Sequence, residues 1–311
     1  MKCLKILDNF ISQQYFLLLM MIVLGMFSPR DLNAQSTQSA WSSDVGAALN
    51  YNDNQGRTQF HWNKKNDVSA ELNASLGYDF LTTLNQVINF RVYVENEQFE
   101  QIRQLSHTSV GSELSFKWQP QLGYSQPFYS LSLNYQYQDY LDDDRDNSEL
   151  MGEFFVSKKI SDKSMLTLGL QHQNIFAQTK VFDSVQNRYF LHADYQFSQW
   201  IKVYSSISYA KGKVWSSAQK FRCDGTAVEN FSQSIQGYDA AQADSSFNDS
   251  FCGDWIAYRS NGKTQSLVVG VDLDVSSQQK LDFSLQKVWV KATGSIQYQS
   301  TLFTSTWYIF F

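Results

Sequence analysis

A histidine with two charged neighbours is the first candidate for chemistry in this chain of 311 residues. Arg188, His192 and Asp194 would share one face of a strand, because alternate side chains of a strand point the same way. A histidine beside a carboxylate can act as a general base, but it needs a nucleophile to activate. The sequence offers no nucleophile beside His192, so it favours a wet wall over a catalytic site.

A serine in a polar segment is the second candidate. Ser260 lies in Tyr258-Arg259-Ser260-Asn261-Gly262-Lys263. The segment resembles the His-Gln-Ser-Asn-Gly-Arg stretch of outer-membrane phospholipase A, which implies a serine nucleophile with a histidine base. Tyr258 stands where that histidine should be, so the Ser260 hydroxyl is not activated. We therefore predict that the chain is not an enzyme, with an outer-membrane lipid hydrolase as the least favoured alternative.

Carboxylates gather in one short run, Leu141-Asp142-Asp143-Asp144-Arg145-Asp146-Asn147. Such a run could bind Ca²⁺ or Mg²⁺, but it lacks the glycine and the terminal glutamate of an EF-hand loop. We predict a solvated hairpin tip instead. The sequence contains no nucleotide-binding loop, zinc-ligand spacing or haem motif, so we expect no cofactor and no metal.

Two cysteines remain once Cys3 is removed with the predicted signal segment. Cys223 and Cys252 are an even pair in an exported chain, which predicts one disulfide. Both lie in the long insertion 212–263. That loop could fold inward as a constriction, stand outside as a binding surface, or simply be stapled against proteolysis.

The elements that must position these residues are strands with one apolar face and one polar face. Residues 68–80 alternate strictly between apolar and polar side chains, as a half-buried strand requires. Each such segment has ten or more residues, enough to cross a bilayer when tilted. We count twelve segments: 41–51, 68–80, 86–96, 107–119, 128–138, 149–159, 165–174, 187–197, 201–211, 264–275, 280–290 and 298–311.

Short and long connections alternate along the chain. This asymmetry is expected of outer-membrane barrels, which have short periplasmic turns and longer outer loops. Aromatic residues cluster at the strand ends of the apolar faces, as in the girdles at the two membrane interfaces. We therefore predict an all-β fold, a single antiparallel transmembrane β-barrel of about twelve strands.

The last strand carries a more specific signal. Phe303, Trp307, Ile309 and Phe311 fall on one face of 303–311. The segment resembles the C-terminal sorting strand of Gram-negative outer-membrane β-barrel proteins. The resemblance implies a location in the outer membrane and assembly by the barrel-assembly machinery.

The front of the chain reads as a targeting segment. Lys2 and Lys5 precede an apolar run at 15–27, and Ala34 offers a cleavage site, which predicts a secretory signal in residues 1–34. The alternative is an N-terminal anchor, but the run is shorter than the roughly 20 residues of a spanning helix. Residues 35–311 would then be the barrel domain, and no later run is long enough for a helical span.

The net charge and the residues expected in the lumen limit the possible functions. The net charge of −5 gives no electrostatic footprint for nucleic acid. The expected partners are outer-membrane lipid and lipopolysaccharide, with an unknown surface partner left open. Strand parity predicts a lumen in which acidic residues outnumber basic ones; its candidate pore-lining residues are Glu71, Arg91, Glu95, Glu113, Lys117, Glu153, Arg188, His192, Asp194 and Asp272.

Two functions are favoured over the lipid hydrolase. An open lumen with an acidic excess would be a narrow passive pore for small hydrophilic or cationic solutes. A lumen filled by its own charge network would be a non-conducting barrel that acts through its outer loops. Twelve strands lie between the barrels that side chains fill and those that leave a channel, so size alone does not choose.

Overall fold

The structure, a computed structural model, describes residues 40–229, 231 and 235–311. Most of this part of the chain lies in antiparallel strands, as the alternating sequence predicts. The predicted signal segment, 1–34, lies outside the described residues. None of the helices in the described ranges is long and apolar enough to span a membrane.

Thirteen strands form one sheet. They are β1 (Ala40–Asn52), β2 (Asp67–Thr83), β3 (Gln86–Phe99), β4 (His107–Trp118), β5 (Phe128–Tyr140), β6 (Asn147–Lys159), β7 (Ser164–Ala177), β8 (Ser184–Ser198), β9 (Ile201–Phe221), β10 (Tyr238–Ala243), β11 (Asp254–Ser276), β12 (Gln279–Ala292) and β13 (Gln297–Phe310).

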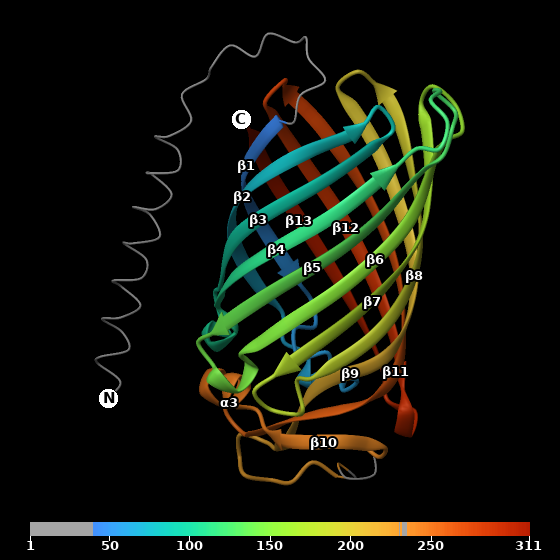
Figure 1. The fold of residues 1–311 in the computed structure, drawn as a ribbon. Coiled ribbons are helices and arrows are strands. Elements are labelled where there is room, and N and C mark those ends of the chain that lie inside the picture. Colours follow the sequence, from blue (N-terminus) through green and yellow to red (C-terminus); the bar gives the residue numbers. More distant parts are fainter. Residues whose placement is uncertain (1–39, 230, 232–234) are drawn as a thin grey trace. The chain divides into compact units, whose positions relative to one another are not determined.

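Twelve of these strands close into a barrel, which confirms the predicted fold (Figure 1). Each strand pairs with its neighbours in the chain, and the first strand pairs with the last, with Asp44 opposite Phe310. Strands β9 and β11 pair directly, because β10 adds to the edge of β11 outside the ring. A closed ring satisfies the backbone hydrogen bonds of every strand, which a lipid environment demands.

The outer face of the barrel is apolar along its length. Leu114, Leu133 and Leu168 are 51%, 52% and 63% exposed, although a water-soluble fold would bury side chains of this kind. Polar residues alternate with them and point into the lumen, among them Glu113 and Asn134. The observed faces therefore match the two faces that sequence parity predicts.

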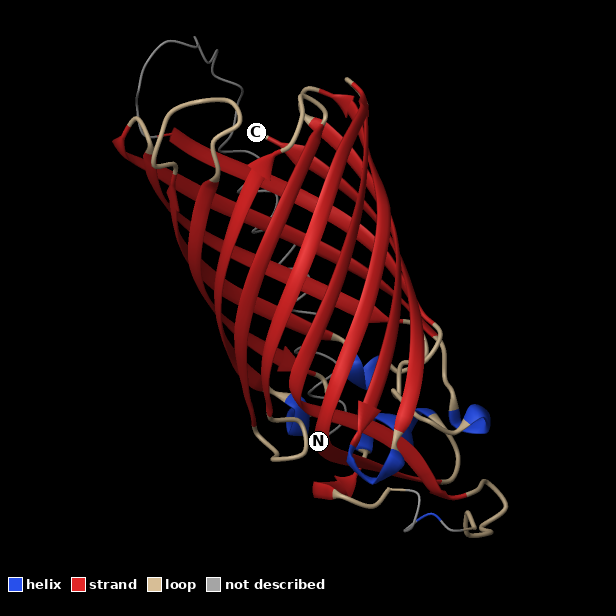
Figure 2. Ribbon diagram, turned by 90° about the vertical axis from the view of Figure 1, so that its right-hand side faces the viewer, coloured by secondary structure: helices blue, strands red, loops and turns tan. Residues whose placement is uncertain are grey.

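The two ends of the barrel differ. One end has turns as short as residues 84–85, 199–200 and 277–278. The other end, which we call the mouth, carries all the described helical turns (Figure 2). These are η1 (His61–Asn63), η2 (Arg103–Leu105), η3 (Asp143–Arg145), α3 (Ser245–Ser250) and η4 (Thr293–Ser295).

The predicted long loop is shorter than expected. Strand β9 has 21 residues and β11 has 23, so both run beyond the ring. Residues 212–221 of β9 and 254–262 of β11 pair with each other, although the sequence analysis assigned them to a loop at 212–263. The connection between β9 and β11 is 222–253, and it contains β10 and α3. The error arose because both faces of this extension are covered, and its apolar and polar residues do not alternate.

Candidate functional site

The predicted pore-lining residues lie on the luminal faces of six strands: Glu71 on β2, Arg91 and Glu95 on β3, Glu113 and Lys117 on β4, Glu153 on β6, Arg188, His192 and Asp194 on β8, and Asp272 on β11. In the antiparallel pairs they face other luminal residues across the register, for example Arg91 opposite Glu113. The structure separates them into three groups rather than one site.

The first group is an acidic wall on β2 to β4. Glu95 and Glu97 flank the buried His107, whose ring nitrogens lie 3.9 Å from one carboxylate oxygen of each. The Ser69 hydroxyl donates to Glu97 at 2.5 Å. Sequence reasoning missed Glu97, because it ended the third strand at residue 96.

The second group is an ion-pair network near the short turns. The Lys202 ammonium lies 2.6 Å from Asp272 and 3.8 Å from Asp194, and Lys280 adds a contact of 2.8 Å to Asp272. His192 Nε2 lies 3.0 Å from Asp194 Oδ1. His192 therefore belongs to a network of lumen charges that links β8, β9, β11 and β12.

The third group, which includes Arg188, lies beneath a structure that covers the mouth. We call this structure the cap; it comprises the described residues of 213–261, namely the extensions of β9 and β11 with β10 and α3 (Figure 1). On one face of the extension, Val214, Ala218 and Tyr258 pack in a buried cluster with Val290 and Tyr298. These two partners belong to β12 and β13, so the cap is anchored to that side of the barrel.

The other face of the extension buries a second set of apolar side chains. Trp255 packs with Ile102 and Leu105, and Ala257 packs with Val181 and Phe182. These partners come from the loops after β3 and β7. Since apolar burial on both faces stabilises the extension, the cap stands across the mouth and not free in solvent.

Polar contacts join the cap to the remaining loops. The Ser217 amide donates to the Gly56 carbonyl at 2.7 Å, and the Thr293 hydroxyl donates to the Gly237 carbonyl at 3.0 Å. The Gln104 side chain donates to Asp249 at 3.0 Å. The cap thus contacts connections all round the mouth, which favours the inward constriction among the three interpretations of the long loop.

Arg145 holds the loop after β5 to the cap. It is 4% exposed and donates to both carboxylate oxygens of Asp244 at 2.9 and 3.1 Å. It also donates to the Ser246 hydroxyl at 2.9 Å and lies 3.5 Å from Asp142. The buried Arg145–Asp244 ion pair is stabilising because both charged groups are also hydrogen-bonded.

The acidic run around Arg145 is therefore not a solvated hairpin tip, as the sequence suggested. Asp142 and Asp146 are buried, and Asp142 accepts hydrogen bonds from Ser245 and Ser246. Burial is the main cause that raises the pKa of Asp146, although its carboxylate accepts a hydrogen bond from the Tyr140 amide. The carboxylates serve to dock the loop onto the cap.

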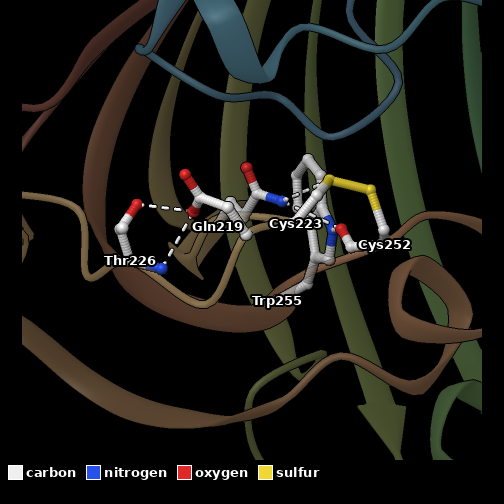
Figure 3. Close-up of a disulfide and its surroundings, with 6 residues drawn as sticks. Gln219, Cys223, Thr226, Cys252 and Trp255 are labelled. Atoms are coloured by element: carbon white, nitrogen blue, oxygen red, sulfur yellow. Dashed lines mark hydrogen bonds between the residues drawn. A yellow bond between two sulfur atoms is a disulfide. The ribbon is translucent and has the colours of Figure 1, made fainter.

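The predicted disulfide joins Cys223 to Cys252, with the two Cα atoms 5.0 Å apart. It lies where β9 ends and β11 begins, at the far end of the cap extension (Figure 3). The Cys252 carbonyl accepts hydrogen bonds from Gln219 at 2.9 Å and from the Trp255 indole at 3.1 Å. The disulfide and these hydrogen bonds therefore hold the end of β9 and the start of β11 together.

Ser260, the other candidate for chemistry, is part of this extension. It is only 2% exposed and pairs across the sheet with Val214 and Tyr238. A serine in this position cannot reach a lipid substrate. Its neighbour Tyr258 is a buried member of the apolar cluster on the cap.

A cavity of about 520 Å³ lies in the lumen below the cap; we call it the mouth chamber. Arg57, Arg145 and Arg188 line it, together with glutamines of β5, β7, β8 and β12 and the aromatic rings of Tyr140, Phe182, Trp215 and Tyr298. A second cavity of about 510 Å³ extends toward the short turns. Arg188 lines both, so the two cavities adjoin at this residue.

Sequence reasoning missed two arginines of the chamber. Arg57 and Arg145 come from loops, for which strand parity makes no prediction. Both guanidinium groups lie over the Trp215 ring, at 4.4 and 4.8 Å from its centre. Their approach depends on contacts between segments far apart in the chain, and no local pattern indicates it.

No protein-family profile matches the chain, and no curated protein resembles it in sequence. Solved structures do resemble it. An outer membrane channel from Pseudomonas putida F1 has a TM-score of 0.55 and 10% identity, over 92% of this chain and 100% of that chain. This chain shares its barrel fold with that structure.

Two other solved barrels are similar at a lower level. The KdgM porin has a TM-score of 0.41 and 9% identity, over 86% of this chain and 98% of that chain. The TodX monoaromatic hydrocarbon channel has a TM-score of 0.44 and 7% identity, over 92% of each chain. At such low identities the shared property is the barrel architecture.

Proposed function

We propose that the protein is a narrow passive channel for small hydrophilic solutes in the outer membrane of a Gram-negative bacterium. The observation that carries the proposal is the pair of adjoining luminal cavities, of about 520 and 510 Å³, with polar residues lining both. The apolar outer wall supports a place in lipid. The channel fold of the Pseudomonas putida structure, whose title names an outer membrane channel, supports the same function.

One wall of the lumen is mainly acidic, and Arg188 lies on the opposite wall. Strands β2 and β8 are six positions apart in a ring of twelve, so Glu71 and Arg188 face each other across the barrel. Glu95 and Glu97 extend the acidic wall on β3, whereas Lys202 on β9 is neutralised by Asp194 and Asp272. Rings of charged side chains set ion selectivity in pores, so the acidic wall favours cations and Arg188 favours anions.

The experiment is single-channel conductance of the purified, folded protein in a planar bilayer, with the reversal potential measured in a salt gradient. We expect small, steady steps, because the cap constricts the mouth. Glu71→Gln combined with Glu95→Gln should shift the reversal potential toward anion preference. Arg188→Gln should shift it toward cation preference.

A folded barrel that gives no current would overturn the channel. The alternative function, a non-conducting barrel that acts through its loops, would then account better for the cap, which fills the mouth with buried side chains. Heat-modifiable mobility in a gel establishes that the sample is folded before the current is measured.

A further inference from the structure

The mouth chamber has a charge composition unlike the rest of the lumen. Three arginines line it, and no carboxylate does among the residues that the structure describes. The carboxylates of the acidic wall lie on β2 to β4, away from the chamber lining. A cavity with uncompensated positive charge in a partly closed space favours an anion.

Two of the three arginines are available to a ligand. Asp244 and Asp142 neutralise Arg145. Direct ion pairs within the described residues occupy Arg91, Arg145 and Arg259, but not Arg57 or Arg188. Glu153 on β6 attracts Arg188 electrostatically without a direct ion pair. A guanidinium with no carboxylate in direct contact keeps a planar fork of donors that matches a carboxylate.

The backbone at Arg57 has an uncommon conformation. Its φ angle is 53°, in the left-handed region that residues other than glycine rarely adopt. The fully buried Asn54 secures this turn, because its amide donates to the carbonyls of Thr58 and Gln299 and accepts from the Thr58 amide. Strain that persists under such restraint is typical of ligand-contacting positions.

Arg188 belongs to a patch of amide side chains on β7 and β8. Gln171 lies opposite Arg188 in the register, and Gln173 lies opposite Gln186. The Arg188 guanidinium donates to the Gln171 side-chain oxygen at 3.5 Å. Amides both donate and accept hydrogen bonds, so such a patch is suited to the hydroxyl groups of a polar ligand.

The chamber lining also includes the aromatic rings of Trp215 and Tyr298, aliphatic side chains such as Val288, and several serines. A chamber lined by charged, polar and apolar side chains fits a ligand with more than one kind of surface. The volume of about 520 Å³ lies within the range of small-molecule sites, about 300–1,000 Å³.

We propose that the mouth chamber binds a small hydroxylated carboxylate, a sugar acid. Arg57 and Arg188 hold its carboxylate, and the glutamine patch receives its hydroxyl groups. The proposal names the solute class of the channel and rests on the proposed function for its biological role. The binding itself can be measured without transport.

The test is calorimetric titration of D-glucuronate into the full folded protein, purified from outer membranes in detergent. We expect saturable binding that weakens at least tenfold in the Arg57→Gln/Arg188→Gln variant, because hydrogen bonds to charged groups are lost. The matched control is Arg222→Gln, which removes one positive charge from an exposed position on the cap outside the chamber lining. It should bind as the wild type does.

D-glucose and acetate separate the two parts of the proposal. Each should bind at least tenfold more weakly than D-glucuronate, since one lacks the carboxylate and the other lacks the hydroxyl groups. Acetate binding as tightly as D-glucuronate would overturn the assignment to a sugar acid. Equal D-glucuronate binding by the wild type and the double variant, or none by either, would overturn the site.

The same samples distinguish this proposal from the channel. Binding without conductance would leave the site standing and remove the channel. Conductance without binding would do the reverse. Gel mobility and far-ultraviolet circular dichroism of the double variant show whether it is folded, and Gln173→Ala with Gln186→Ala tests the chamber without removing either arginine.

Discussion

At the residue scale, Arg145 connects separate parts of the mouth. Arg145 stacks on Phe182 at 4.0 Å and on Trp215 at 4.8 Å while it pairs with Asp244. It thereby joins the loop after β5, the loop after β7 and the cap. Asp244 is completely buried and also accepts a hydrogen bond from Ser217, so the pair has no access to water as a replacement partner.

Arg145→Ala should release the cap. Removing one partner of a buried ion pair costs about 3–5 kcal/mol, because the other charge is left buried and unpaired. We expect faster trypsin cleavage within the cap and larger conductance steps, with the barrel still heat-modifiable. Arg145→Lys should give an intermediate effect, since lysine keeps the charge but loses the bidentate geometry and the stacking.

Arg222→Ala is the control for the trypsin experiment, because it removes an exposed arginine of the same segment. An Arg145→Ala protein whose cap is cut no faster than that of the wild type would show that apolar packing alone holds the cap.

At the element scale, the cap is an extension of the barrel and not a separate domain. The β9–β11 pairing continues without interruption from the ring through Gly262 and Gly212 into the cap. At Gly212 an added Cβ atom would lie 2.0 Å from the Val185 carbonyl oxygen. This position needs glycine because β8 passes too close, at the level where the extension leaves the ring.

The disulfide should stabilise the cap without affecting the barrel. Cys223 and Cys252 are 29 positions apart, and closing a loop of that length stabilises by about 3–4 kcal/mol in the chain-entropy description. We expect Cys223→Ser with Cys252→Ser to accelerate amide hydrogen exchange in β10 and α3. Amide exchange in β1 to β8 should be unchanged, because the disulfide takes no part in the pairing of those strands.

If the double serine variant exchanged faster throughout the barrel, the cap would be part of one cooperative unit with the ring. The reduced wild-type protein provides the matched comparison, because it loses the bridge without a change of sequence.

At the scale of the whole molecule, the outer face of the sheet meets lipid and the inner face meets the polar lumen. Leu133 and Ser132 are neighbours on β5, but Leu133 points outward and is 52% exposed, whereas Ser132 lies opposite Glu153 on the luminal side. A single residue step along the strand therefore changes the environment from lipid to the polar lumen.

Leu133→Arg should impair folding into bilayers, because arginine on the lipid face near the midplane costs about 2–4 kcal/mol. Ser132→Arg should be far better tolerated, since Glu153 offers it a partner. The measurement is the free energy of unfolding by denaturant in lipid vesicles. Equal losses for the two variants would contradict the assignment of the outer face to lipid.

Local patterning was enough to predict the barrel. Strict alternation in residues 68–80 and in the other segments indicated the strands, because a strand places successive side chains on opposite faces and a lipid-facing barrel makes that difference large. Parity also predicted that Glu71, Glu95 and Arg188 face the lumen. The even pair Cys223 and Cys252 predicted the disulfide, and the aromatic last strand predicted a barrel of the outer membrane.

Only the tertiary structure decided what lies in the mouth. Arg57 and Arg145 come from two loops and meet Trp215 of the β9 extension there, and their meeting depends on packing between segments up to about half the chain apart. The extension 212–221 with 254–262 carries no alternation, because both its faces are buried, and so it had the appearance of a loop. Apolar and polar residues alternate along a strand because the two faces of the sheet meet different solvents. Where protein covers both faces, the sequence shows no such alternation.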